Sequence, residues 1–144
     1  MASESEPHDS PVQWVNGHIR RYVESDGADG HEWRGNTILL LTTIGRRSGK
    51  PRRTALIYRE DGGRYVVVAS KGGADAPPAW YLNLAENPEV RVQVGADKFP
   101  ARARTAAAEE KPALWELMAE KWPDYNNYQA KTDREIPVIV LERS

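Results

Sequence analysis

The alternation of apolar and polar residues along the chain predicts six β-strands. Residues 90–94 alternate valine with arginine and glutamine, the pattern of a strand with one buried face. Residues 65–70 are apolar at almost every position, which is typical of a strand covered on both faces. The expected strands are residues 36–43, 52–59, 65–70, 90–94, 99–104 and 136–141. Short turns such as Asp61-Gly62-Gly63 join them, so we expect a mostly antiparallel sheet.

This sheet is expected to close into a small barrel with peripheral helices, a mainly β member of the α+β class. Closure hides the edges of strands as apolar as these. Helical spacing of apolar residues predicts helices at about residues 10–23, 79–86, 108–122 and 125–131. We divide the chain into a disordered N-terminus (1–9), an N-terminal helix and loop (10–35) and a barrel domain (36–144).

The first predicted helix has an apolar stripe and a basic flank. Ser10 can cap it, and Pro11 suits its first turn. The stripe consists of Val12, Val15, Ile19 and Val23. The helix either packs on the barrel or lies on a membrane surface, with Arg20 and Arg21 on its flank. No apolar run approaches the ~18 residues of a membrane span. We therefore expect a cytoplasmic protein, peripheral at the inner face of the membrane if the helix binds there.

Composition excludes several classes of function. The length of 144 residues suits one domain with one core. The 20 basic and 21 acidic residues give a formal net charge of −1, which argues against a general nucleic-acid binder. The chain has no cysteine, so disulfides, thiol catalysis and cysteine-ligated zinc are excluded. With only three histidines, all near the start, we expect no metal site.

A cationic loop (residues 46–53) joins the first two predicted strands. Its basic residues are Arg46, Arg47, Lys50, Arg52 and Arg53. Guanidinium groups bind phosphate or carboxylate in pairs, and glycines such as Gly45 and Gly49 let backbone amides approach an anion. The spacing is not that of a Walker A loop, because Pro51 follows the lysine. The segment is therefore either an anion site or an exposed hairpin with solvated charges.

Two further segments combine polar or aromatic groups with glycine or a short helix. Ser70-Lys71-Gly72-Gly73 brings a hydroxyl, a cation and open backbone amides to the end of a strand, and its alternative is an ordinary glycine turn. Trp80-Tyr81-Leu82-Asn83 can wall a flat aromatic ligand, with Asn83 supplying polar contacts. The alternative for this second segment is core packing by one helix face.

The third segment is aromatic and lies near the C-terminus. Trp122, Tyr125 and Tyr128 follow one another at steps of three residues. They form either an aromatic mini-core or a source of protonated phenols, because an unperturbed phenol has a pKa of about 10. In the second case a tyrosine could donate to an oxygen on which negative charge grows during reduction.

Together these segments resemble the deazaflavin-dependent nitroreductase family of actinobacteria, also called the nitroreductase/quinone reductase family. The resemblance covers about residues 36–141. Its matching strings are Leu41-Thr42-Thr43-Ile44-Gly45-Arg46-Arg47-Ser48-Gly49-Lys50-Pro51-Arg52, Asp61-Gly62-Gly63, Val68-Ala69-Ser70-Lys71-Gly72-Gly73, Trp80-Tyr81-Leu82-Asn83-Leu84, Tyr125-Asn126-Asn127-Tyr128-Gln129 and Thr132-Asp133-Arg134.

The resemblance implies a split β-barrel, as in flavin-binding reductases, and coenzyme F420, a deazaflavin with a phosphate and an oligoglutamate tail. It places the anionic tail on Arg46, Arg47, Ser48 and Arg52. The other implied cofactor contacts are Arg53, Thr54, Ala55, Leu56 and Ile57 along the cofactor, and Val68, Ala69, Ser70, Lys71, Ala79, Trp80, Tyr81, Leu82, Asn83 and Tyr125 around its ring system.

The activity implied by the resemblance is hydride transfer from the reduced deazaflavin to a small hydrophobic acceptor. Acceptors in the family include quinones, nitroaromatics and activated enones such as unsaturated lactones. Tyr125 is the implied donor that protonates or stabilises the product anion, with Tyr128 and Ser70 nearby. The nitroimidazole-reducing branch has tyrosines where this chain has Ile57 and Trp122, so two phenols are missing from the acceptor pocket.

Two alternatives to this function stay open. The same barrel could hold FMN, which would make the chain a flavin-dependent oxidoreductase. The chain could also bind a deazaflavin or, through its basic loop, a nucleic acid without turnover; the balanced charge weighs against nucleic acid. We expect a monomer or a homodimer.

Overall fold

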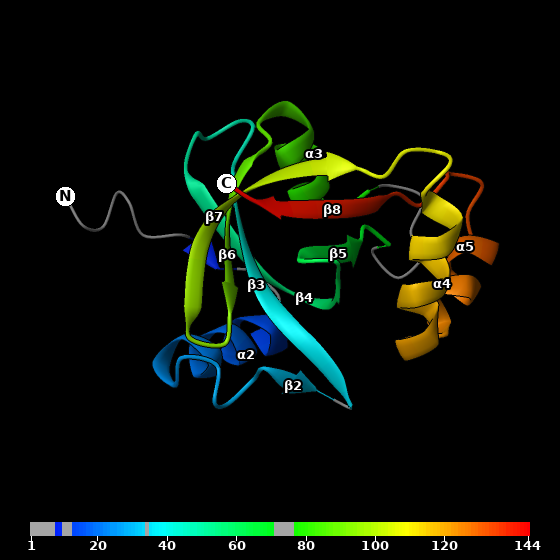
Figure 1. The fold of residues 1–144 in the computed structure, drawn as a ribbon. Coiled ribbons are helices and arrows are strands. Elements are labelled where there is room, and N and C mark those ends of the chain that lie inside the picture. The colour runs from blue at the N-terminus through cyan, green and yellow to red at the C-terminus, as the bar shows by residue number, and fades with distance from the viewer. Residues whose placement is uncertain (1–7, 10–12, 34, 71–76) are drawn as a thin grey trace.

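A computed structural model describes residues 8–9, 13–33, 35–70 and 77–144 of the chain. Over these residues six long strands form a barrel with helices around it (Figure 1). The long strands are β3 (Asn36–Ile44), β4 (Pro51–Asp61), β5 (Arg64–Val68), β6 (Glu89–Val94), β7 (Asp97–Thr105) and β8 (Val138–Arg143). The helices are α2 (Gln13–Glu24), α3 (Ala79–Glu86), α4 (Lys111–Lys121) and α5 (Asp124–Ala130), and two short strands are β1 (His8–Asp9) and β2 (Glu32–Trp33).

The six long strands pair in a closed antiparallel ring. The order is β4, β5, β8, β7, β6 and β3, and β3 pairs with β4 to close it. The β3–β4 ladder runs from the pair Thr37 and Tyr58 to the pair Ile44 and Pro51, whereas β5 pairs with β4 only at residues 59–61. β4 and β5 are not paired before residue 59, so the ring is split between these two strands along most of β4. This confirms the predicted fold class.

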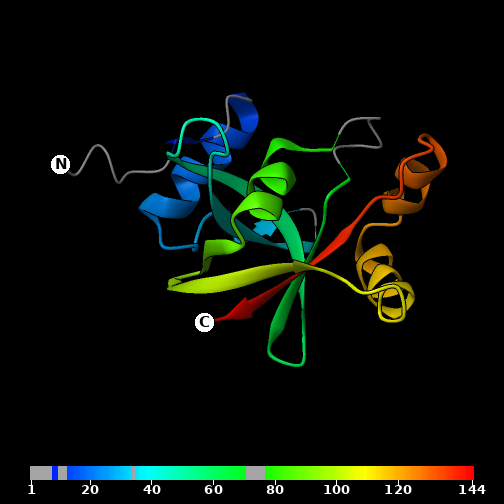
Figure 2. The same cartoon turned by 90° about the horizontal axis from the view of Figure 1, so that it is seen from above.

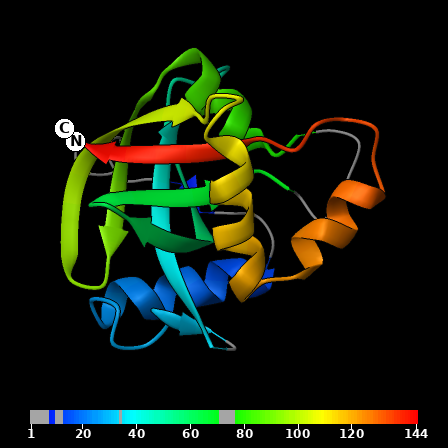
Figure 3. The ribbon, with the colours of Figure 1, turned by 45° about the vertical axis from the view of Figure 1, so that its right-hand side comes forward.

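Two apolar layers meet at β5. Val67 faces the barrel interior, where it joins a cluster that includes Leu39 and Phe99. Val66 and Val68 face the opposite way and pack with residues of α4 and α5. All three valines are buried, so the prediction of a strand covered on both faces is confirmed. α4 and α5 stand against this outer layer (Figure 3).

Helix α2 packs on β3 and β4 with one apolar face. Ile19 and Tyr22 are fully buried and contact a cluster that includes Ile38 and Leu40. The Tyr22 hydroxyl donates to the Ile38 carbonyl at 2.9 Å and accepts from the Gly95 N–H at 2.6 Å. This burial favours the packed alternative for this part of the helix. Within the described ranges, no helix is both long enough and apolar enough to cross a membrane.

Several element boundaries differ from those that the pattern predicts. β5 ends at Val68 rather than at residue 70, and β8 begins at Val138 rather than at residue 136. Pro137 explains the second shift because it has no N–H for a ladder, although its carbonyl still accepts from Ala69 N–H. α4 begins at Lys111 and not near residue 108, with Pro112 in its first turn.

The N-terminal segment differs from the sequence expectation at two residues. His8 and Asp9, which the pattern assigns to a disordered terminus, form β1 and pair with Arg52 and Arg53 of β4. The rest of that terminus, together with Ser10, Pro11, Val12 and the predicted site segment 71–73, lies outside the described residues.

Candidate functional site

The cationic loop is a tight turn held by its own backbone. The Gly45 N–H donates to the Lys50 carbonyl at 2.8 Å, and the Gly49 N–H donates to the Gly45 carbonyl at 2.8 Å. Gly49 has a φ of 69°, in the region that favours glycine. A Cβ at Gly45 would lie 2.6 Å from the Ser48 Oγ. The two glycines are therefore explained by backbone conformation and close packing.

Four cations of this loop have no acidic partner among the residues that the structure describes. The side chains of Arg46, Arg47, Lys50 and Arg52 are exposed. Within the described residues, none of them forms an ion pair, although basic residues elsewhere do so with Asp26, Asp29, Asp61, Glu89, Asp97, Glu110, Glu120, Glu135 and Glu142. Clustered positive charge without neutralisation raises the local potential and attracts anions. The loop can therefore hold a ligand with several negative charges.

The open side of β4 begins at this loop. Residues 54–57 are half-buried and pair with β3 on one side. Among the described strands, β1 reaches the other side only at residues 52 and 53, and β5 only at 59–61. Alternate residues of an antiparallel strand direct their N–H and C=O groups away from the paired neighbour. This stretch of β4 therefore offers backbone donors and acceptors to a polar, planar ligand.

Helix α3 lies beside the cationic loop (Figure 2). Its residues Trp80 and Tyr81 are half-buried and pack against the barrel core, whereas Ala79 is exposed. Asn83 is 5% exposed; its Oδ1 accepts from the Arg46 N–H at 3.1 Å, and its Nδ2 donates to Thr43 Oγ1 at 3.1 Å. The amide that the sequence assigns to a ligand thus has two partners within the protein.

An arginine that sequence reasoning did not include among the site residues holds the end of β5. The Arg134 guanidinium donates to the Ser70 carbonyl at 2.7 Å and to the Ala69 carbonyl at 3.3 Å. Gln129 fixes this arginine, because its Nε2 donates to the Arg134 carbonyl at 2.8 Å and its Oε1 accepts from the Ile136 N–H at 2.9 Å. Ser70 is half-buried, and Lys71 lies outside the described residues. The string Thr132-Asp133-Arg134 marks this arginine in the sequence, but nothing there identifies its partners.

Tyr125 and Tyr128 lie on α5, against the outer layer of β5. Tyr125 is 5% exposed, and its ring centroid lies 6.1 Å from that of Tyr128. Burial, with a smaller contribution from Tyr128, raises the pKa of Tyr125 above its ordinary value. The Tyr128 hydroxyl accepts from Trp122 Nε1 at 3.2 Å. Tyr125 therefore stays a neutral phenol over the whole range in which enzymes operate.

Three of the predicted site residues from separate elements meet in one cluster. Tyr125 of α5, Val68 of β5 and Ile57 of β4 belong to the same apolar group. Arg52 lies five residues before Ile57 on β4, which corresponds to ~17 Å along a strand. The described site thus has a phenol and apolar side chains at one end of the split, a cationic loop at the other and open backbone between them.

These features define a split-barrel protein with an exposed cationic loop at one end of β4 and an apolar cluster containing Ile57 and Tyr125 farther along it. The model of the F420H(2)-dependent quinone reductase family matches residues 14–143. An F420H(2)-dependent quinone reductase of Mycobacterium tuberculosis is 40% identical over 136 residues, which is 92% of this chain and 91% of the relative. The chain therefore belongs to the F420H(2)-dependent quinone reductase family.

Solved structures agree with this assignment. A structure described as an F420-H2 dependent reductase is 46% identical with a TM-score of 0.68, covering 73% of this chain and 93% of the other. A domain-swapped dimer is 42% identical with a TM-score of 0.71, covering 92% of this chain and 100% of the other. A heme storage protein of Vibrio cholerae, 17% identical with a TM-score of 0.58 over 74% of this chain and 81% of the other, supports the fold alone.

Proposed function

We propose that this chain is an oxidoreductase that transfers a hydride from reduced coenzyme F420 to a small hydrophobic acceptor such as a quinone. The observation that carries the proposal is a cluster of positive charge without ion pairs to described residues at one end of the split in the barrel, with a neutral phenol at the other. The comparisons support the same activity, since the Mycobacterium tuberculosis relative is named as an F420H(2)-dependent quinone reductase and one solved structure as an F420-H2 dependent reductase.

The charged tail of the cofactor fits the donor chemistry of the cationic loop. A phosphate and several carboxylates need several cations, and the guanidinium groups of Arg46, Arg47 and Arg52 form no ion pair among the described residues. Ser48 would add a hydroxyl. Backbone groups of 53–57, with 68–71 and 79–82 around the ring, would then orient the deazaflavin, which supplies the hydride when bound.

Tyr125 would donate a proton or a hydrogen bond to the acceptor oxygen on which charge develops. Its raised pKa supports this assignment because the phenol keeps its proton. Tyr128 and Ser70 would lie next to the acceptor as secondary donors. The missing phenols at Ile57 and Trp122 leave the pocket more apolar than that of the nitroimidazole-reducing branch, which favours quinones as acceptors.

The experiment that tests the function is an acceptor panel under anaerobic conditions. The full chain is mixed with reduced F420 and, in separate reactions, a quinone, a nitroaromatic and an unsaturated lactone, and oxidation of the cofactor is followed by absorbance. We expect acceptor-dependent oxidation, fastest with quinones. Binding of reduced F420 without its oxidation by any acceptor would favour the alternative of a protein that binds the deazaflavin without turnover. Retention of FMN after dialysis, with no F420 binding, would favour the flavin-dependent alternative.

The substitution Tyr125→Phe tests the proposed donor. We expect turnover to fall roughly 10- to 1000-fold with F420 affinity unchanged, because one proton donor is lost while the ring is kept. Tyr128→Phe is the matched control, since it removes a phenol from the same helix and is expected to have the smaller effect. An unchanged rate for Tyr125→Phe with several acceptors would make this residue a part of the pocket wall.

Assembly and membrane contact stay predictions. A homodimer is the alternative that the domain-swapped relative favours. Ile19 and Tyr22 are buried against the barrel and are therefore not available for contact of α2 with a membrane.

A further inference from the structure

We propose that Asn83 is a positioning residue: by joining α3 to the cationic loop, it fixes the loop in the conformation that binds the anionic tail. This inference rests on the function proposed above and concerns the same site. It gives Asn83 a role different from the ligand contact that the sequence suggests.

Few hydrogen bonds join the tip of the cationic loop, residues 46–50, to the rest of the described fold. Residues 46–50 are exposed and extend beyond the ladder of β3 and β4, which ends at the pair Ile44 and Pro51. Within the part of the chain that the structure describes, the bond from the Arg46 N–H to Asn83 Oδ1 is the one hydrogen bond that joins these residues to another element. The other hydrogen bonds that the structure describes for residues 46–50, including that from the Lys50 N–H to Ser48 Oγ, stay within the turn from Gly45 to Lys50.

Asn83 itself is held in a rigid part of the molecule. It is 5% exposed, and the next residue, Leu84, is 3% exposed and belongs to the barrel core. Its Nδ2 donates to Thr43 Oγ1 at 3.1 Å, and Thr43 is fully buried at the end of β3. Both polar atoms of the Asn83 amide are therefore hydrogen-bonded. The side chain holds Arg46, the first residue of the loop, in a fixed position relative to α3.

The chemistry of the amide matches this task. Arg46 presents an N–H that needs an acceptor, while Thr43 presents a hydroxyl oxygen that can accept. An amide supplies one donor and one acceptor without a charge, whereas a buried carboxylate would introduce negative charge beside the cations that are to bind an anion. An apolar side chain would leave the Arg46 N–H and the Thr43 hydroxyl without these partners.

Loss of the Asn83 anchor is expected to weaken binding of the anionic tail of the cofactor and not binding of its ring system. If the loop occupies its bound conformation for only a tenth of the time after the anchor is lost, apparent affinity falls about tenfold. Residues 46–50 are not among the proposed contacts to the ring system, so the strength of those contacts should not change. Two ligands separate these effects: F420, and the same deazaflavin lacking the phosphate and the glutamates.

The test compares Asn83→Leu with Gln93→Leu. Gln93 is a second buried amide, 7% exposed, whose Nε2 donates to the Gly95 carbonyl in the turn between β6 and β7. That turn lies at the opposite end of the barrel from the cationic loop (Figure 1). Both variants lose a buried amide, so any general loss of stability is shared.

We expect Asn83→Leu to weaken F420 binding about tenfold and to change binding of the tail-less deazaflavin less than about twofold. Gln93→Leu should leave the ratio of the two affinities as in the wild type. Equal weakening of both ligands by Asn83→Leu, or no weakening of either, would overturn the proposal. If the wild-type protein bound neither ligand, the proposed function itself would fail.

Thr43→Val provides a second variant if Asn83→Leu folds poorly. It keeps the size of the side chain and removes only the partner of Nδ2. Because the bond to Arg46 is kept, we expect a loss of about two- to threefold, again confined to F420. An unchanged ratio of affinities in this variant, together with a folded Asn83→Leu that binds F420 as the wild type does, would contradict the positioning role.

Discussion

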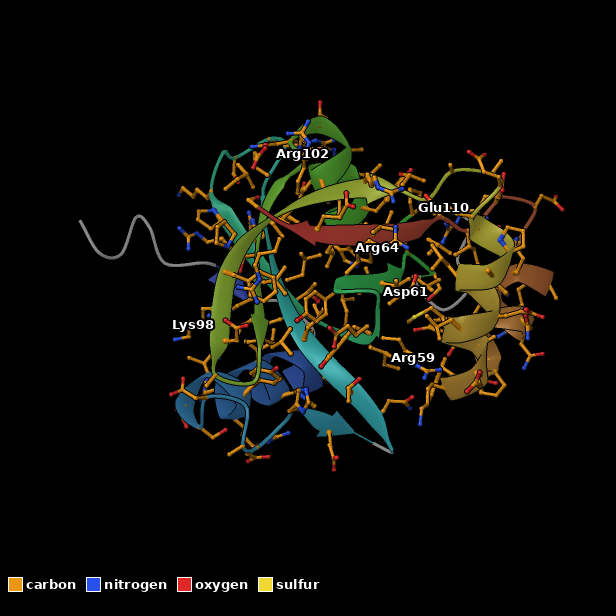
Figure 4. The ribbon with its side chains drawn as sticks, viewed as in Figure 1. Arg59, Asp61, Arg64, Lys98, Arg102 and Glu110 are labelled. Carbon is orange, nitrogen blue, oxygen red and sulfur yellow. The ribbon has the colours of Figure 1, made fainter. Side chains whose placement is uncertain are left out.

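Two groups of arginines in this barrel differ in their acidic partners. The cationic loop has four exposed cations that form no ion pair among the described residues. At the junction of β4, β5, β7, β8 and the start of α4, the Glu110 network consists of Asp61, Arg64, Arg104, Glu110 and Glu142. Figure 4 labels Asp61, Arg64 and Glu110 of this network. Arg64 lies 2.8 Å from the Asp61 carboxylate and 3.7 Å from that of Glu110, and Arg104 bonds to both Glu110 and Glu142.

The difference separates charges that hold the fold from charges that can bind a ligand. Every guanidinium of the Glu110 network already has a carboxylate partner, so an anion from solution would have to displace one. The cations of the loop repel one another, which costs stability, but their donors are available to an anionic ligand. Replacement of charge should therefore act on stability in one group and on binding in the other.

The largest expected effect is on F420 binding, when the arginines of the cationic loop are replaced. Replacing Arg46, Arg47 and Arg52 together with alanine should weaken F420 binding about 100-fold or more, because each charge-assisted bond contributes about 1.5–3 kcal/mol. The midpoint of thermal unfolding should stay the same or rise slightly, since repulsion is relieved. A fluorescence titration and a thermal melt of the same sample measure both.

A matched triple variant controls for net charge. Arg20, Lys98 and Lys121 are exposed and lie outside the loop. Replacing these three residues with alanine removes the same number of positive charges as the loop variant. Equal weakening of F420 binding by both triple variants would mean that overall charge, and not the loop, attracts the tail.

The second prediction concerns the stability of the Glu110 network. Glu110→Gln should lower the midpoint of thermal unfolding at neutral pH by a few degrees and leave F420 affinity unchanged. Besides its arginine partners, Glu110 accepts from the Ala107 N–H at 2.8 Å just before α4. A loss of F420 affinity without a change in stability would reverse the roles that we assign to the two groups.

The pH dependence of this effect follows from the pKa of Glu110. The hydrogen bond from Arg104, then that from Ala107, lower this pKa from 4.5 to about 2. A depressed pKa stabilises the fold fully above the unfolded value near 4.5, and this stabilisation is lost as pH falls toward 2. The stability difference between wild type and Glu110→Gln should therefore be largest at neutral pH and disappear near pH 2. A difference independent of pH in acid denaturation curves would contradict the assignment.

The sequence was sufficient for the barrel and for the position of the cationic loop. Alternation identified the six strands, because each has a face that must be buried. Gly45 and Gly49 indicated the tight turn, since Gly49 has a positive φ and a side chain at Gly45 would meet Ser48 Oγ. Which of the predicted residues contact the cofactor stays a prediction.

The partners of individual polar groups could not be predicted from the sequence. Asn83 meets Thr43 and Arg46 from a helix some forty positions later, and Arg134 reaches the carbonyls of Ala69 and Ser70. Such bonds depend on how elements pack, and local propensity contains no information about packing. The end of β5 was missed for a related reason, because Ala69 bonds to Pro137 in a region where no ladder can continue.

The smallest effect is expected at Arg102, which lies outside both groups and forms an exposed ion pair. Arg102 lies 2.8 Å from Glu89, with both side chains more than half exposed, so water screens the pair. Arg102→Ala should change the free energy of unfolding by less than about 0.5 kcal/mol and F420 affinity by less than about twofold. Urea denaturation and the same fluorescence titration measure both. A loss of stability equal to that of Glu110→Gln would mean that an ion pair stabilises the fold regardless of its exposure. A loss of F420 affinity equal to that of the loop variant would mean that cations outside the loop also bind the tail.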